Sequence, residues 1–184
     1  DANGENGALL LEPSRANLLQ FSEYVLGLFS PVNGSISANY GTSPEGLMNS
    51  TRIECDNTTN SHIYYAPAGL SVGTEYRFSC YYKGTAGEKV YIRSISQGGG
   101  ASGGKTITFT GEWQREDIIL TPGTGASFVY IQDARSGTST ATDFEVFGCQ
   151  LEAGSYVSSY IPNHSGTGGV TRAADSCSVT GASD

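Results

Sequence analysis

The sequence predicts an all-β protein, a two-sheet antiparallel β-sandwich of the jelly-roll type with an irregular C-terminal strap. Short runs of alternating apolar and polar residues recur along the chain and are separated by Gly, Asn, Asp and Pro. Glycine (25 residues) and tyrosine (11 residues) are abundant, which is typical of short strands joined by tight turns. No stretch of about ten residues or more keeps the i, i+3, i+4 apolar spacing of a helix.

The N-terminal part predicts only loosely defined strands. The apolar run 8–11 is expected to open the first strand, after a Gly- and Asn-rich start. Residues 16–30 follow no clean period, so we expect a strand and then a loop there. Asn33-Gly34 is a turn signal, and residues 35–40 alternate as a further strand.

The middle of the chain has a more regular pattern. Strands are expected at 51–55, 62–66, 75–83, 89–96, 106–110, 113–120 and 127–133. Within 75–83 the two faces differ, because successive side chains of a strand point to opposite sides. One face carries Tyr76, Phe78, Cys80 and Tyr82. Roughly ten short strands at this spacing fit a jelly roll.

The segment from Phe144 to Pro162 is expected to organise the fold. Its first half alternates with apolar residues on both sides, which predicts a strand inside a sheet. We expect Phe144, Val146 and Gly148 on one side and Phe147, Cys149 and Leu151 on the other. Ala153-Gly154-Ser155 ends the strand, and the following aromatic residues are expected to hold a strap onto the body. Residues 1–162 are predicted to form the sandwich domain, and 163–184 a tail or linker towards a following domain.

Charge and cysteine spacing disfavour several partners. The net charge is −8 and the ten basic residues are scattered singly, whereas nucleic-acid binding needs clustered Lys and Arg. No apolar run approaches the roughly 20 residues that cross a bilayer, so membrane insertion is not expected. The four cysteines form no C-x-x-C pair, which disfavours zinc. No cofactor is expected, and only a structural calcium ion at Asp133 or Asp143 is left open.

Catalytic motifs are not convincing. Residues 99–106 match the phosphate-loop pattern, but a β-branched run follows at 106–110 where such a loop requires a helix. Glycoside hydrolysis needs two facing carboxylates, and the sequence does not show which acids converge. The candidates are Glu112, Glu116, Asp117, Asp133, Asp143 and Glu145. Neither His62 nor His164 lies near a nucleophile motif, so we expect a protein that is not an enzyme.

Aromatic and basic residues on the strands favour a glycan-binding surface. Sugars bind to aromatic rings flanked by hydrogen-bonding groups, and several such residues lie opposite the more apolar strand faces. The candidate ligand-binding residues are Tyr64, Arg77, Tyr81, Tyr91, Arg93 and Trp113. The alternative for the tyrosines is packing at the sheet rim, and for Trp113 a structural plug at one end of the sandwich.

Two segments carry a resemblance to a known family. Residues 9–19 (LLLEPSRANLL) with Phe21-Ser22-Glu23 resemble the opening of modules in bacteriophage and prophage tail proteins. Residues 148–156 (GCQLEAGSY), 159–162 (SYIP) and 170–175 (VTRAAD) are similar to the ending of these modules. The chain departs from the pattern at 24–30, where many relatives carry a Trp, and at Cys149, which replaces the usual Ala.

The resemblance implies a non-catalytic, carbohydrate-binding-module-like domain of a longer tail, fibre or polysaccharide-active protein. The expected partner is a polysaccharide or cell-surface glycan, and the expected location is the virion or the extracellular space. An alternative is a structural or assembly module of a virion fibre, with a homo-oligomer formed through the parent protein. A polysaccharide-degrading enzyme domain is the lesser alternative.

Overall fold

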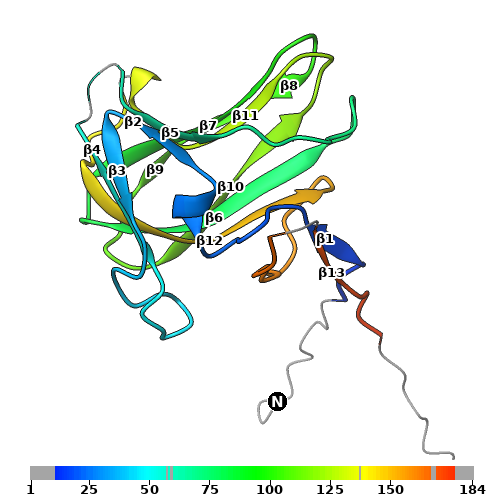
Figure 1. Ribbon diagram of the computed structural model, residues 1–184, viewed down its shortest axis with the longest axis horizontal. Coiled ribbons are helices and arrows are strands. Elements are labelled where there is room, and N and C mark those ends of the chain that lie inside the picture. The colour runs from blue at the N-terminus through cyan, green and yellow to red at the C-terminus, as the bar shows by residue number, and fades with distance from the viewer. Residues whose placement is uncertain (1–10, 57, 59, 137, 167–168, 177–184) are drawn as a thin grey trace, which may run out of the picture.

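The alternating runs of the sequence form two antiparallel sheets packed face to face, which confirms the predicted sandwich (Figure 1). The computed structural model describes residues 11–56, 58, 60–136, 138–166 and 169–176. One sheet has the spatial order β3 (Gly34–Ser37), β4 (Thr51–Cys55), β12 (Asp143–Ala153), β6 (Tyr76–Gly84), β10 (Gln114–Thr121), β8 (Ala101–Ser102). The other has the order β2 (Ser30–Val32), β5 (His62–Tyr65), β11 (Ser127–Asp133), β7 (Lys89–Ser96), β9 (Gly104–Thr108).

The predicted strand bounds agree best with the structure where apolar and polar residues alternate strongly. The strands at 51–55, 89–96 and 127–133 are confirmed as β4, β7 and β11. The apolar run 8–11 lies almost wholly outside the described residues. The strand expected at the start of 16–30 is present only as the short β1 (Arg15–Asn17). Other short elements were missed: β2, β8, β13 (Val170–Arg172) and the 3-10 turns η1 (Val25–Gly27) and η2 (Ala134–Ser136). Elements of two or three residues are too short for a periodic signal.

The core lies between the two sheets. From β6, the side chains of Phe78, Cys80 and Tyr82 are fully buried, as the predicted apolar face requires. Val90 and Ile92 of β7 meet them from the other sheet and are also inaccessible to solvent. Burying a side chain of this size contributes about 1.5–3 kcal/mol each relative to exposure. This burial is what leaves the alternate residues of β6 and β7 on the outer faces.

Strand β12 lies between β4 and β6, so its predicted position inside a sheet is confirmed. The predicted division of its side chains was wrong beyond Gly148. Gly148 has φ +63, and the pairing with β6 shifts between Phe147 and Gln150. This β-bulge turns Cys149 and Leu151 into the core, so that they join Phe144 and Val146. Phe147, Gln150 and Glu152 consequently lie on the outer side.

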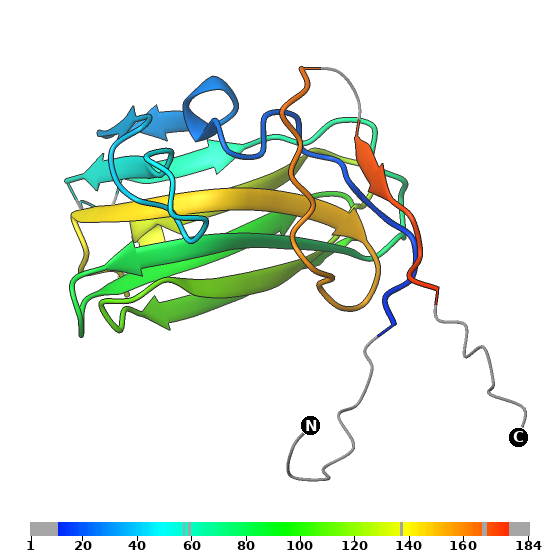
Figure 2. The same ribbon diagram turned by 90° about the horizontal axis from the view of Figure 1, so that it is seen from below.

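The C-terminal strap, residues 154–166, crosses the outer face of the six-stranded sheet (Figure 2). Ile161 N–H donates to Gln150 Oε1 at 2.7 Å, and Ser158 N–H donates to Glu152 Oε1 at 2.9 Å. The ring of Tyr160 packs against Phe147 and Tyr81, with centroids 5.8 and 6.3 Å away. The strap therefore covers the outward side chains of β12 and part of β6.

Contact with the body continues past residue 162, the expected domain boundary. Asn163 is fully buried and donates to Leu19 O at 2.8 Å. Farther along, β13 pairs antiparallel with β1 from Arg15↔Arg172 to Asn17↔Val170. Within the described residues, no helix has the length and apolar character to span a bilayer.

Candidate functional site

Four aromatic side chains gather on the outer face of the five-stranded sheet. Tyr130 of β11 lies opposite Tyr64 of β5 on one side and Arg93 of β7 on the other. Because directly paired residues share a face, their side chains all point away from the core. Tyr64 has ring centroids 5.9 Å from Tyr130, 6.1 Å from Phe128 and 5.5 Å from His62. We call His62, Tyr64, Phe128 and Tyr130 the aromatic platform.

Two arginines border the aromatic platform and are fixed by one buried acid. The Arg135 guanidinium carbon lies 4.8 Å from the centroid of the Tyr130 ring, within cation–π range. Its Nε and Nη2 atoms donate to the two Asp133 oxygens at 2.7 and 2.9 Å. Arg93 Nη1 also reaches Asp133, at 3.4 Å. Asp133 is inaccessible to solvent, whereas the two arginine side chains remain 35% and 40% exposed, so their remaining donors can bind a ligand.

The electrostatics of this surface follow from these contacts. Burial raises the pKa of Asp133, but the hydrogen bonds from Arg135 outweigh burial, and the net pKa is below its ordinary value. Burial, together with the positive charge of Arg135, lowers the pKa of His62. At neutral pH the His62 imidazole of this surface is therefore neutral.

The other predicted tyrosine of this face, Tyr91, lies closer to the sheet edge. It pairs with Thr106 of β9, and its hydroxyl lies against Gly104, where any Cβ would collide with it. Its backbone N–H is bound by Ser139 Oγ at 2.9 Å. Tyr91 is half-buried, so its ring extends the surface beside Arg93 without joining the aromatic platform.

The predicted ligand-binding residues on the strands lie on two different sheets. Arg77 and Tyr81 lie on the outer face of the six-stranded sheet, where Arg77 pairs with Glu75 at 3.1 Å and Asp117 at 3.2 Å. Tyr81 packs against Tyr160 and lies under the Arg115 guanidinium, 5.5 Å from its ring centroid. The strap thus engages Tyr81.

Trp113 lies apart from both groups, just before β10. Its Nε1–H donates to Thr42 O at 3.1 Å, and the Lys83 ammonium lies 5.9 Å from its ring. The hydrogen bond holds the loop between β3 and β4 against the sandwich. This contact fits the structural role that was the alternative for Trp113.

Sequence reasoning missed Phe128, Tyr130 and Arg135. The alternation within 127–133 places Phe128 and Tyr130 on one face, so the strand pattern contained that signal. Arg135 follows the strand in η2, and no sequence pattern predicts that its side chain folds back over Tyr130.

Most of the candidate carboxylates have separate basic partners. Asp143 binds Arg52 through two hydrogen bonds of 2.9 and 2.7 Å, Asp117 binds Arg77, and Glu116 contacts Lys105. Both predicted calcium ligands, Asp133 and Asp143, are therefore engaged by arginine. Among the described residues, no three His, Cys, Asp or Glu side chains are grouped as a metal site would require.

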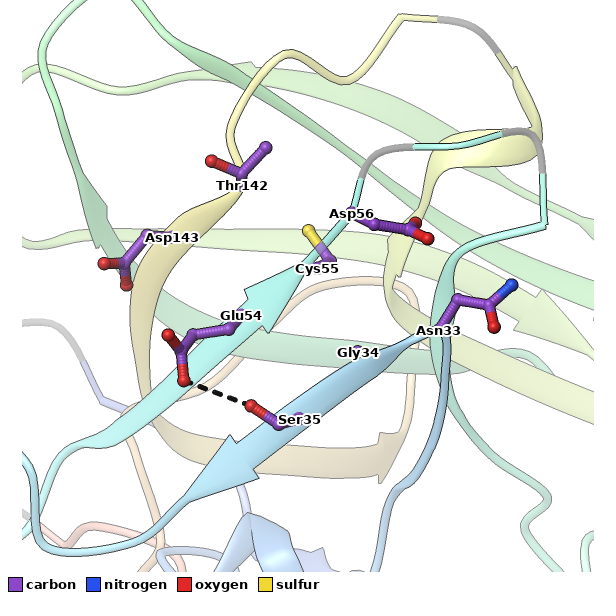
Figure 3. A pocket seen from close by; sticks show the side chains of 8 residues that line it. All are labelled: Asn33, Gly34, Ser35, Glu54, Cys55, Asp56, Thr142 and Asp143. Atoms are coloured by element: carbon purple, nitrogen blue, oxygen red, sulfur yellow. Dashed lines mark hydrogen bonds between the residues drawn. The ribbon is translucent and has the colours of Figure 1, made fainter.

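An open hollow lies at one end of the sandwich, between β3, β4 and the start of β12 (Figure 3). It is open, has a volume of about 630 Å³, and is lined by Asn33, Gly34, Ser35, Glu54, Cys55, Asp56, Thr142 and Asp143. Ser35 Oγ donates to Glu54 at 3.1 Å, and Arg52 pairs with both Glu54 and Asp143. None of the lining residues is aromatic, so this hollow lacks the surface against which a sugar ring would stack.

Comparison with known proteins finds structures of the same fold but no matching family. No protein-family model matches the sequence, and no curated protein matches it. Solved structures do match. The CBM22-1 xylan-binding domain of Paenibacillus barcinonensis Xyn10C has a TM-score of 0.56 at 10% identity, over 83% of this chain and 100% of that domain.

Two longer proteins contain the same fold. The CBM22-1 and GH10 modules of Clostridium thermocellum xylanase 10B, complexed with xylohexaose, match with a TM-score of 0.51 and 13% identity. The tailspike protein 4 enzymatically active domain of bacteriophage CBA120 matches with a TM-score of 0.50 and 12% identity. These matches cover 77% and 74% of this chain, but only 28% and 21% of the longer chains. At these identities the likeness establishes the sandwich fold alone.

Proposed function

We propose that the protein is a non-catalytic carbohydrate-binding module, and that a polysaccharide lies along the outer face of the five-stranded sheet. The observation that carries this proposal is the aromatic platform flanked by Arg93 and Arg135. The C–H faces of sugar rings pack on Tyr64 and Phe128, and the guanidinium donors bind the sugar hydroxyls. The xylan-binding domain with the same fold supports this class of ligand.

The salt bridges of Asp133 prepare the two arginines for binding. Since the buried carboxylate already orients both guanidinium groups, less side-chain entropy is lost when a ligand binds. Tyr130 is 5% exposed and supports Arg135 from below, so its contribution to a ligand acts through that arginine. Tyr64 and Phe128 remain partly exposed and would make the direct ring contacts.

The test is affinity electrophoresis and calorimetry with soluble xylan, mixed-linkage β-glucan and bacterial surface polysaccharides. Tyr64→Ala and Arg93→Ala should each weaken binding about tenfold, the equivalent of roughly 1.4 kcal/mol. Matched controls replace the same residue types elsewhere: Tyr156→Ala on the strap and Arg77→Ala on the other sheet. All four variants should keep the wild-type fold by circular dichroism.

Loss of binding in Arg77→Ala, with Arg93→Ala unaffected, would assign the ligand to the six-stranded sheet instead. Failure of the wild-type protein to bind any of a broad panel of polysaccharides would contradict the proposal as a whole. Release of reducing ends from one of them would show an enzyme.

A structural module of a virion fibre is the second candidate. It is favoured by the phage-type opening and closing segments and by the shared fold with a phage tailspike domain. A stable trimer in light scattering together with no glycan binding would support it. In either case we place the protein on a virion or in the extracellular space.

A further inference from the structure

A second hollow lies away from the aromatic platform, between three segments that are distant in sequence. It has a volume of about 220 Å³ and is lined by Phe21, Glu23, Tyr24, Asn39, Asn49, Asn163 and His164. These residues come from the segment after β1, the loop joining β3 to β4, and the strap. Pockets for drug-sized ligands measure about 300–1,000 Å³, so this hollow fits a single small ring. We call it the strap pocket.

The Glu23 carboxylate is the polar centre of the strap pocket. Asn49 Nδ2 donates to Glu23 Oε2 at 3.3 Å, and the Tyr160 hydroxyl donates to Glu23 Oε1 at 3.3 Å. His164 Nδ1 lies 3.7 Å from Glu23 Oε2 at the exposed rim. An ionised carboxylate has about four acceptor positions, so Glu23 retains capacity for hydroxyl or ammonium donors. Asn49 Oδ1 is buried in the wall with no partner among the described residues, a state that is unfavourable unless a donor reaches it.

Aromatic side chains supply the apolar part of the lining. Phe21 is 39% exposed and Tyr24 is 46% exposed, although both are large rings. The Phe21 ring lies against Gly166, where a Cβ would approach it to 2.7 Å. The strap and the 21–24 segment therefore hold the two rings at the surface on one side of the pocket.

Two lining residues have backbone conformations that L-amino acids rarely adopt. Phe21 has φ 48 and Asn39 has φ 55. Asn tolerates this region, but for a bulky side chain such as Phe21 it is a strained outlier. The conformation is held by Phe21 N–H donating to Ser165 O at 3.3 Å and Tyr24 N–H donating to Phe21 O at 2.8 Å. Strain of this kind gathers at binding sites.

We propose that the strap pocket binds one sugar ring, neutral or amino-substituted, separately from the polysaccharide on the aromatic platform. Hydroxyl or ammonium groups of the sugar donate to Glu23, and its C–H edge contacts Tyr24 and Phe21. Acidic sugars are excluded, because their carboxylate would approach Glu23 in a protein of net charge −8. The pocket would thus recognise a terminal or side-chain sugar, whereas the platform holds a chain.

The two histidines of the chain provide one reporter for each site. His62 lies in the aromatic platform and His164 lines the strap pocket. The imidazole proton signals can be followed by NMR while three probes are added: methyl β-galactoside, glucosamine and glucuronate. With methyl β-galactoside or glucosamine we expect the His164 signals to shift in a saturable way, and glucuronate should cause no shift. The His62 signals should stay unchanged with these single sugars and respond to soluble xylan.

Tyr24→Ala and Glu23→Gln should weaken the His164 response at least about tenfold. Tyr156→Ala is the matched control, because Tyr156 is 49% exposed and lies outside the pocket. A His62 response to xylan must be retained in every variant, which also shows that the fold is intact. Absence of any saturable His164 shift with the two favoured probes would overturn the strap-pocket proposal, whatever His62 does. A response equal in wild type and Tyr24→Ala, or an equal response to glucuronate, would do the same.

Discussion

The Sγ atoms of Cys80 and Cys149 lie 3.1 Å apart inside the sandwich, on the neighbouring strands β6 and β12. The contact exists because the bulge at Gly148 turns Cys149 towards the core. Both thiols are free and fully buried, and burial raises the pKa of Cys149. In the native protein Cys149 should therefore not react as a thiolate at neutral pH.

We expect oxidised glutathione to link Cys80 to Cys149 only slowly and at alkaline pH, where transient opening of the sandwich lets a thiolate form and reach the reagent. The link then requires only a small approach of the two sulfur atoms. Peptide mapping by mass spectrometry should find this link with loss of two hydrogen atoms, while Cys55 remains a thiol. Cys55 is buried on β4 and donates to Ala141 O at 3.4 Å, away from the pair. A link that instead joins Cys55 to either residue would contradict the arrangement.

Asn17 should be the most sensitive polar residue of the strap region. It is fully buried, donates to Cys149 O at 3.3 Å and Ile161 O at 2.9 Å, and accepts from Leu19 N–H and Leu151 N–H, both at 3.1 Å. Asn17→Ala leaves these buried groups unpaired and should cost roughly 2–4 kcal/mol in urea unfolding.

Asn60 is exposed, so Asn60→Ala is the matched control for Asn17→Ala. It should change the free energy of unfolding by no more than about 0.5 kcal/mol. The Asn17 variant should also expose the strap to limited proteolysis before the sandwich itself unfolds. Equal stability of the two variants would show that the strap does not depend on Asn17.

Gly148→Ala should destabilise the protein more than Gly46→Ala. Both glycines have positive φ, +63 and +81, so both substitutions introduce backbone strain of about 1–2 kcal/mol. A Cβ at Gly46 meets nothing within 4 Å, but one at Gly148 meets the Tyr160 and Tyr81 rings at 3.2 and 3.3 Å. We expect a further loss of about 1–2 kcal/mol for Gly148→Ala in thermal unfolding. Equal losses would mean that the rings move aside freely.

The ion pair of Glu12 and Arg172 should make the strap region sensitive to acid. The hydrogen bond from Arg172 lowers the pKa of Glu12 from 4.5 to about 2. A folded-state pKa below the unfolded one stabilises the fold above pH 4.5, and this contribution is lost as the pH falls from 4.5 to about 2. The protection factor against hydrogen exchange of the Ser159 N–H, which donates to Glu12 Oε1 at 2.8 Å, should fall across that range.

Glu12→Gln separates this effect from the titration of Asp133 and Asp143, whose pKa values are also lowered. The variant should show a low protection factor at Ser159 at every pH, with no further decrease in acid. Unchanged protection in Glu12→Gln would remove the ion pair as the cause.

Sequence reasoning reached the fold class and the long strands, because alternation and turn residues act locally. It misplaced Cys149 and Leu151, since a bulge at one glycine reverses every later side chain of a strand. The pattern identifies the outward face of a strand but not the sheet to which the strand belongs. For that reason Arg77 and Tyr81 could not be separated from Tyr64 and Arg93 before the topology was known. The strap pocket draws Glu23, Asn49 and His164 from three distant segments, and no local pattern links them.

The antiparallel pairing of β1 with β13 has a mechanical consequence. Arg15 lies opposite Arg172 at the outer end of the pair, and Asn17 lies opposite Val170 at the inner end. Tension applied through the two ends of the chain would therefore separate β1 from β13 one residue pair at a time. It would not load all the pairs at once, as a shearing force does. The first step of unfolding under load should be the separation of β1 from β13, with the five-stranded sheet still intact.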